Sequence, residues 1–211
     1  MKARFTRDEI AAAALALVDT KGLAGLSMRS LASELGTGPM TLYNYVSDKE
    51  ALEELVVAAV MMDAPAPQLT DDWRADVEFV AHAMWAAVRR HPAAIPLVLT
   101  RRISSAAAVA PAEALIGALS RGGLTGEVLL AAFRAVLSFV LGAQEAGLGS
   151  LSDRDAREVA AKIGEVAGEA YPHAAALAKI AQKSSAATEF ENGLAMLLDG
   201  IALRATVRRS R

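Results

Sequence analysis

The sequence contains no cysteine, and only 5% of its residues are aromatic. The lack of cysteine excludes a disulfide scaffold, a thiolate metal site and a cysteine nucleophile, and it fits a reducing cytosol. Apolar residues make up 54% of the chain and are mostly alanine, leucine and valine. Alanine and leucine are strong helix formers, whereas the aromatic and β-branched residues that favour strands are sparse. The composition therefore predicts an all-α fold.

Long uncharged apolar runs are also lacking. A membrane-spanning helix needs roughly 18 apolar residues, and Arg134 interrupts the longest candidate. The chain turns acidic at Asp8 and Glu9, before any apolar run of the signal-peptide type begins. We therefore expect a cytoplasmic protein with no membrane partner.

The net charge of −2 conceals an uneven distribution. Residues 1–50 carry six basic and six acidic side chains, whereas residues 51–203 carry twelve basic and eighteen acidic ones. The last segment, 204–211, adds four arginines to which the sequence assigns no role. Because an acidic surface repels phosphate, any contact with nucleic acid falls to the neutral first segment. The charge permits such a contact without arguing for it.

The first helix is marked by the residues at its N-terminus. Thr6 and Glu9 have the spacing of a capping box, and Phe5 and Ile10 are placed to form a hydrophobic staple. Apolar residues then recur at helical spacing until Gly22, where the helix is predicted to end.

Two short helices and a tight turn follow. Ser27 is placed to cap the first of these helices, and Gly36 to end it. The turn 36–39 closes with a proline that suits the first position of the next helix, which is predicted over 40–46. Residues 47–50 have the pattern of a second capping box that begins at Ser47, and they open a fourth helix.

The proline-containing segment 64–67 ends the fourth helix, because the residue before a proline is displaced from the α region. We therefore predict a first domain at 1–50 and a second domain at 51–211, with a connecting helix over about 48–63.

Helical periodicity predicts six further stretches in the second domain, one of them broken near Tyr171 and Pro172. Thr188 and Glu191 have the spacing of a cap for the last stretch. The stretches are expected at 71–90, 93–102, 106–121, 126–147, 153–182 and 188–207.

Two short helices joined by a glycine-containing turn form a helix-turn-helix unit. In such units the second helix enters the major groove and presents side chains to the base edges. Leu42 and Val46 are placed to face the helical core, and exposed tyrosines suit contacts with phosphates, sugars and thymine methyl groups. The alternative is a tight helical hairpin with a purely structural role. The side chains expected to face outward are Thr37, Thr41, Tyr43, Asn44 and Tyr45.

The runs LSMRSLASELG at 26–36, MTLYNYV at 40–46 and DKEAL at 48–52 resemble the signature of the tetracycline-repressor family. The resemblance implies that Asn44 and Tyr45 set the sequence preference, and that the protein binds double-stranded DNA. The residues that it places on DNA are Arg29, Thr41, Tyr43, Tyr45 and Lys49, with Thr37, Pro39 and Met40 near the groove.

A weaker resemblance to the C-terminal domain of the tetracycline repressors themselves covers segments 73–102, 139–143, 190–194 and 198–201. Here the sequence departs from the subfamily, because its magnesium-ligating histidine is replaced by Val98 and its acidic metal-site position by Ala146. The departures argue against a tetracycline–magnesium effector. We expect no metal and no cofactor.

A homodimer is expected on mechanistic grounds. One recognition helix reads too few base pairs for a genomic address, so two half-sites of an inverted-repeat operator are needed. The helices at 126–147 and 188–207 are the predicted seam, where Gly193 and Gly200 permit a close approach. The alternative is a stripe that packs the core of a single chain. The predicted dimer interface is Phe190, Leu194, Leu197, Leu198 and Ile201.

The resemblance implies an effector pocket between the connecting helix and the dimer seam. Its apolar walls predict a small and largely hydrophobic effector. Each of its residues is also compatible with ordinary core packing or a solvated surface. The predicted lining is Phe79, His82, Met84, Trp85, Arg89, Val98, Leu99, Arg101, Phe133, Leu137 and Gln144.

These observations predict a ligand-responsive transcriptional regulator, and specifically a repressor that a small-molecule effector releases from its operator. One alternative is an enzyme, but His82, His91 and His173 have no metal-binding spacing, and no hydrolase or phosphate-loop motif is present. Another is a helical protein-interaction or small-molecule-binding protein that does not bind DNA. The sequence identifies neither the effector nor the operator and its genes, and repressor rather than activator is the family's majority behaviour.

Overall fold

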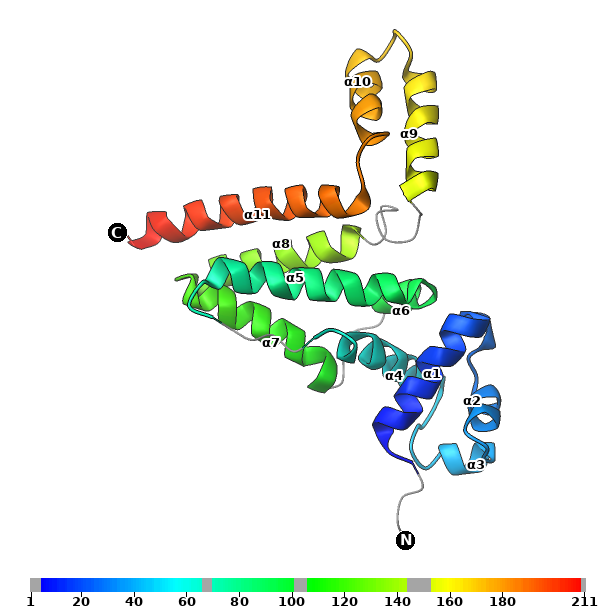
Figure 1. Ribbon diagram of the computed structural model, residues 1–211. Helices are drawn as coiled ribbons and strands as arrows, with labels where there is room; N and C mark the ends of the chain where they lie inside the picture. The colour runs from blue at the N-terminus through cyan, green and yellow to red at the C-terminus, as the bar shows by residue number, and fades with distance from the viewer. Residues whose placement is uncertain (1–4, 66–69, 101–105, 144–152, 210–211) are drawn as a thin grey trace. The chain divides into compact units, whose positions relative to one another are not determined.

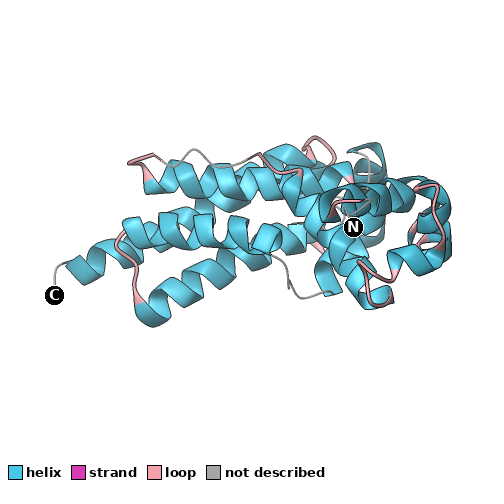
Figure 2. Cartoon of the chain, turned by 90° about the horizontal axis from the view of Figure 1, so that it is seen from below, coloured by secondary structure: helices cyan, strands magenta, loops and turns pink. Residues whose placement is uncertain are grey.

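The computed structural model describes residues 5–65, 70–100, 106–143 and 153–209. Within these ranges every regular element is a helix and no strand occurs (Figure 2). The all-α prediction is therefore confirmed. Packing divides the chain into two compact units, Met1–Arg121 and Gly122–Arg211.

The first unit begins with helix α1, Arg7–Lys21. The predicted capping box is confirmed, because the Glu9 N–H donates to the Thr6 hydroxyl at 3.2 Å and the Thr6 N–H donates to the Glu9 carboxylate at 2.7 Å. The hydrogen bonds from the Thr6 backbone and side chain lower the pKa of Glu9. Gly22 ends the helix with φ of 67°, a left-handed conformation that glycine adopts without strain.

Helices α2, Met28–Glu34, and α3, Pro39–Leu42, follow α1 after the short 3₁₀ helix η1, Leu23–Gly25. Helix α4, Lys49–Met62, then packs along α1 (Figure 1). We call α1, α2 and α3 the head.

The core of the head extends beyond the head itself. Its centre is the apolar face of α1 together with the inward side chains of α2, α3 and α4. Val88 from α5, Trp73–Arg90, belongs to the same cluster. So do Ala94 of η2, Pro92–Ala94, and residues of α6, Ile95–Thr100. The head is therefore built onto the end of α5 through a shared apolar core.

A buried carboxylate joins the start of α5 to the end of α7, Ala106–Arg121. Asp76 is only 3% exposed, and it accepts the Thr70 N–H and hydroxyl, each at 2.9 Å. The Arg121 guanidinium also donates to it. Burial raises the pKa of Asp76, but the hydrogen bonds from Thr70 and Arg121 outweigh burial and leave that pKa below its ordinary value.

The described part of the second unit contains four helices, of which the first and last pack on each other. The rings of Phe139 and Phe190 lie 5.3 Å apart between these two helices. The other two form a hairpin whose break near Tyr171 and Pro172 was predicted and is confirmed. The four helices are α8, Gly126–Ala143; α9, Asp153–Ala167; α10, Pro172–Ala181; and α11, Ala186–Arg209.

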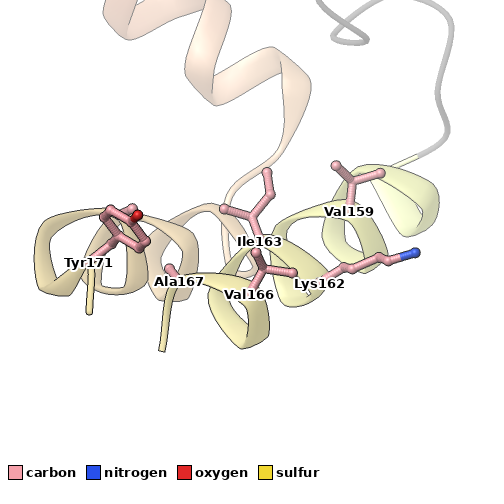
Figure 3. A pocket seen from close by; sticks show the side chains of 7 residues that line it. Val159, Lys162, Ile163, Val166, Ala167 and Tyr171 are labelled. Carbon is pink, nitrogen blue, oxygen red and sulfur yellow. The ribbon is translucent and has the colours of Figure 1, made fainter. Parts of the chain in front are cut away.

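Two open apolar surfaces belong to the second unit. The α9–α10 hairpin has a groove of about 350 Å³ (Figure 3). The groove is lined by Val159, Ile163 and Val166 of α9 and by Tyr171 at the turn before α10. A second groove, of about 460 Å³, runs between α8 and α11. Among the described helices, α8 is long and apolar enough to cross a membrane, a test that core helices of soluble proteins also pass.

Several predicted helix ends were wrong. The third helix ends at Leu42 instead of Val46, since residues 43–45 continue as turns. The cap of α4 is Asp48 and not Ser47, because the Asp48 carboxylate accepts the Ala51 N–H at 2.8 Å and Ser47 donates to it. The last helix starts before Thr188, whose N–H donates to the Ser185 hydroxyl at 3.2 Å.

Candidate nucleic-acid interface

The helix α2 is fixed at its start by two serines. The Ser30 N–H donates to the Ser27 hydroxyl at 3.1 Å, and the Ser27 N–H donates to the Ser30 hydroxyl at 2.9 Å. The Ser30 hydroxyl also donates to the Gly25 carbonyl oxygen at 2.6 Å, which connects α2 to the segment before it. Ser27 was the predicted cap, and the reciprocal partner is a serine where a capping box usually has glutamate.

The turn between α2 and α3 is a Schellman motif. The Thr37 N–H donates to the Ala32 carbonyl at 2.9 Å and the Gly36 N–H donates to the Ser33 carbonyl at 3.2 Å, which is the paired pattern of this helix end. Gly36 has φ of 60°, the left-handed conformation that the motif requires and glycine supplies. Pro39 then occupies the first position of α3, as predicted. The turn therefore fixes the direction of α3 with backbone hydrogen bonds.

The helix α3 buries one side and exposes the other. Leu42 and Val46 are buried, as their predicted inward orientation requires. Met40 of α3 is 77% exposed and Tyr43, directly after α3, is 49% exposed, a high degree of exposure for such large side chains. Pro39 and Asn44 are exposed, whereas Thr37, Thr41 and Tyr45 are half-buried.

Tyr45 differs from its neighbours because it is engaged within the head. Its ring meets Phe5 edge-on at 6.3 Å, and its hydroxyl accepts the Phe5 N–H at 3.4 Å. Tyr45 therefore connects the turn after α3 to the residues directly before α1. Its predicted role in sequence preference stays a prediction.

Two cationic residues of the predicted site flank α3. Arg29 is exposed in the first turn of α2, and Lys49 is exposed in the first turn of α4. The Lys49 Nζ also lies 3.8 Å from the carboxylate of Glu53, a residue that is only 8% exposed. The hydrogen bond from the Ala51 N–H, with a further one from Ser47, lowers the pKa of Asp48 beside it.

The predicted effector residues of α5 and α6 have mixed exposure. Met84 and Trp85 are buried, and the Arg89 guanidinium lies over the Trp85 ring at 4.7 Å. Phe79 is 44% exposed, and His82 is half-buried.

The rest of the predicted pocket is distributed over other parts of the chain. Val98 and Leu99 pack against the core of the head, and Phe133 and Leu137 are half-buried in α8, in the other unit. Arg101 and Gln144, like Ala146, lie outside the described residues. The pocket stays a prediction.

The dimer prediction for α11 needs correction at three residues. Phe190, Leu194 and Leu198 are at most 1% exposed within the single chain, so they form the core that was the alternative interpretation. Gly193 belongs to the same contact, because a Cβ atom there would lie 2.7 Å from the Phe139 ring. These three residues are therefore not available to a partner chain, and only other residues of α11 are exposed to one.

An open face of α11 lies next to this core stripe. Half-buried Leu197 and Ile201, which is only 7% exposed, line the groove between α8 and α11, and Met196 beside them is 72% exposed. Gly200 lines the same groove, with nothing within 4 Å of the position of an added Cβ.

Sequence reasoning missed a cluster of ionic residues at the base of the head. His91, at the end of α5, lies between Asp19 of α1 and Asp63 at the end of α4. No local motif indicated this cluster, because the partners are 72 and 28 residues from His91. The only signal was the presence of a histidine at a helix end.

The fold and the α2–α3 geometry together define a helix-turn-helix protein. Two family models match the chain, "Bacterial regulatory proteins, tetR family" at residues 10–56 and "Tetracyclin repressor-like, C-terminal domain" at residues 65–205. The chain belongs to the tetracycline-repressor family of transcriptional regulators.

Individual relatives agree with this assignment. The HTH-type transcriptional repressor DrrR1 of Streptomyces coeruleorubidus is 36% identical over 149 residues, which cover 70% of this chain and 55% of that protein. The chain thus matches little more than half the length of this relative. The regulator SCO7222 of Streptomyces coelicolor has a TM-score of 0.80 and 27% identity, covering 94% of this chain and 98% of its own. ActR of the same organism, solved in complex with (S)-DNPA, has a TM-score of 0.76 and 25% identity, covering 96% and 100%.

Proposed function

We propose that this chain is a ligand-responsive, DNA-binding transcriptional regulator that acts as a repressor in the cytoplasm and has no enzymatic activity. The observation that carries the proposal is the exposed side of α3, where Met40 and Tyr43 project from a short helix whose direction is fixed by the turn before it. Family membership supports the same conclusion.

In this proposal residues 1–50 read the operator. The exposed residues of α3 and its flanking turns contact base edges and sugars, and Arg29 and Lys49 contact phosphates. The balanced charge of this segment avoids the repulsion that the acidic remainder of the chain would experience near phosphate. The proposed contact residues are Arg29, Thr37, Pro39, Met40, Thr41, Tyr43, Asn44, Tyr45 and Lys49.

Residues 51–211 form the sensing and dimerising part, with α4 as the connecting helix. The operator is an inverted repeat, because two copies of α3 are needed to specify a genomic site. The open groove between α8 and α11 supports a homodimer, since a chain that exposes Met196 at 72% and Leu203 at 68% leaves apolar surface for a second copy.

The effector is a small and largely apolar organic molecule. ActR was solved with (S)-DNPA, a small-molecule ligand of that protein. Val98 stands where the tetracycline repressors place a metal-ligating histidine, and an apolar side chain there supports an effector that needs no metal. The α5 residues Phe79, Trp85 and Arg89 supply apolar surface and one cation for such a ligand.

The regulation is a shift between two populations of the head. The helix α4 packs on α1, and it also packs on α5, α6 and α7, so movement of the sensing helices reaches the head through it. A coupling free energy of about 1–3 kcal/mol reduces operator affinity by roughly 5- to 150-fold.

Fluorescence anisotropy on duplex DNA tests the proposal. Duplexes from the DNA that flanks the gene of this protein, and duplexes selected from random sequence, are titrated with protein at two salt concentrations. We expect sequence-selective binding that weakens as salt rises, because released counterions drive phosphate contacts. Uniform weak binding to every selected duplex would overturn the proposal and leave the helix-turn-helix as architecture.

A further inference from the structure

His91, at the end of α5, contacts side chains of α1 and of the end of α4. Its Nδ1 lies 2.8 Å from Asp19 Oδ2 on α1, and its Nε2 lies 3.4 Å from Asp63 Oδ2 at the end of α4. Arg90 reaches the same Asp63 oxygen through Nε at 2.5 Å and donates to the Asp63 carbonyl at 2.7 Å. The His91 side chain is only 16% exposed, so these contacts are partly shielded from water.

The two carboxylates make the bridge dependent on the charge of the imidazole. A carboxylate only accepts hydrogen bonds, and a neutral imidazole has one N–H to donate, so it satisfies one of the two partners. An imidazolium donates from both ring nitrogens and satisfies Asp19 and Asp63 together. Histidine is the side chain whose charge ordinarily changes between pH 5 and 8.

Three helices supply the ionisable groups that the described residues place around His91. The helix α1 contributes Asp19, with Asp8 farther along the same groove, α4 contributes Asp63, and α5 contributes Arg90. The sequences of η2 and α6, which also pack here, contain no ionisable side chain. The hydrogen bond from Arg90, with a further one from His91, lowers the pKa of Asp63, which therefore stays charged at neutral pH.

The bridge lies where the head joins the sensing helices. The helix α1 packs on η2, directly after His91, and Ala94 and Ile95 belong to the core of the head. A contact that holds both α1 and the end of α4 to this corner restrains the orientation of α2 and α3, which are built on α1.

We propose that His91 is a positioning residue for DNA recognition: its charged imidazole ties α1 and the end of α4 to the corner between α5 and η2, and so holds the head in its operator-binding orientation. The inference rests on the proposed DNA-binding function. It predicts that operator affinity falls as pH rises, because deprotonation removes one of the two hydrogen bonds.

The test is anisotropy on a selected operator duplex at pH 6 and pH 8, with wild type, His91→Gln and His173→Gln. Wild-type affinity is expected to fall about 5-fold or more between these pH values, the lower range of measured coupling between sites. His91→Gln is expected to bind at both pH values as wild type does at pH 8. His173→Gln, which changes an exposed histidine on α10, is the matched control and should keep the wild-type profile.

If His91→Gln is unfolded by circular dichroism, Asp19→Asn provides the same comparison, since it removes one charged partner of the bridge. Parallel pH profiles for wild type and the folded variant overturn the positioning role. If wild type binds the operator selectively but wild type and variant have parallel pH profiles, this inference is wrong and the proposed function stands. The absence of selective wild-type binding at either pH sinks the proposed function and the inference together.

Discussion

The two units of this chain complete their packing in different ways. In the first unit, ionic contacts join separate helices, with Asp76 and Arg121 linking α5 to α7 and His91 linking α1 to α4. In the described part of the second unit, the pair Arg154–Glu158 runs along one helix. The second unit exposes apolar side chains along each of α8, α9, α10 and α11, whereas the exposed large apolar side chains of the first unit include Met40 and Tyr43 at the recognition helix.

This difference indicates what each unit is built to do. Polar contacts between helices require specific geometry, so they fix the orientation of the head on the helices that carry it. Open apolar faces require a partner, because soluble monomers rarely leave large contiguous apolar patches uncovered. The first unit is therefore suited to hold a reading helix in register, and the second is suited to association.

The sharpest contrast within the second unit lies along α11. Phe190→Ala should lower the free energy of unfolding by about 3–5 kcal/mol, because it leaves a cavity in a fully buried site. Met196→Ala, on the exposed side of the same helix, opens no cavity in the single chain, so it should lower the free energy of unfolding by less, through weaker contact with a second copy. Urea unfolding at one protein concentration measures both. Equal losses of unfolding free energy would mean that Phe190 is not in a buried core or that Met196 is not on an exposed face.

The contrast between the units predicts where DNA binding is lost. Tyr43→Ala should weaken operator affinity about 10-fold or more, because it removes a groove or phosphate contact of about 1–3 kcal/mol. Tyr171→Ala, on a tyrosine of the second unit that is 66% exposed, serves as the matched control and should leave affinity unchanged. Anisotropy on the selected operator compares the two. An unchanged affinity for Tyr43→Ala would remove α3 from the interface.

Two glycines of α11 differ in the space around them: Gly193 packs against Phe139, whereas Gly200 faces open space within the chain. Gly193→Ala should destabilise the fold by about 1–3 kcal/mol, because its Cβ would lie 2.7 Å from the Phe139 ring. Gly200→Ala should stabilise the helix of the single chain by up to about 1 kcal/mol, since nothing in that chain lies within 4 Å of the added atom, so both variants are compared at a protein concentration below that of association. Thermal unfolding gives the sign of each change. Changes of the same sign would mean that the two glycines do not differ in packing.

The ionic anchor of the first unit predicts a pH dependence. The pKa of Asp76 is lower in the folded chain, so its contribution is full above the ordinary aspartate pKa of about 3.9 and is lost as pH falls below it. Asp76→Asn should cost about 1–2 kcal/mol at pH 7, a moderate value because Arg121 is partly exposed to solvent. Urea unfolding at pH 7, 5 and 3 should show this cost shrinking toward pH 3. A constant cost would contradict the ionic role.

Local signals in the sequence predicted most helix positions. Thr6 and Ser27 cap their helices as predicted, and Gly36 ends α2, because caps and turns depend on residues within a few positions of each other. Where two residues competed for one role, the prediction failed. Asp48 replaced Ser47 as the cap of α4, since a carboxylate accepts the backbone N–H more strongly than a hydroxyl does.

Tertiary roles were harder to predict from one sequence. Periodicity found the apolar stripe of α11 but did not say whether it packs within the chain or against a partner, and Phe190 proved to face α8. Tyr45 fitted the outward pattern of α3, yet its ring contacts Phe5, 40 residues earlier. The His91 bridge left no trace in spacing, because its partners meet only after α1, α4 and α5 pack.

The most direct test of the account is the stoichiometry of the protein on its operator, measured by light scattering on complexes with a duplex carrying the full inverted repeat and a duplex carrying one half-site. We expect two chains on the full repeat and much weaker binding to the half-site, because the second unit pairs two heads. One chain bound to each duplex with equal affinity would contradict it.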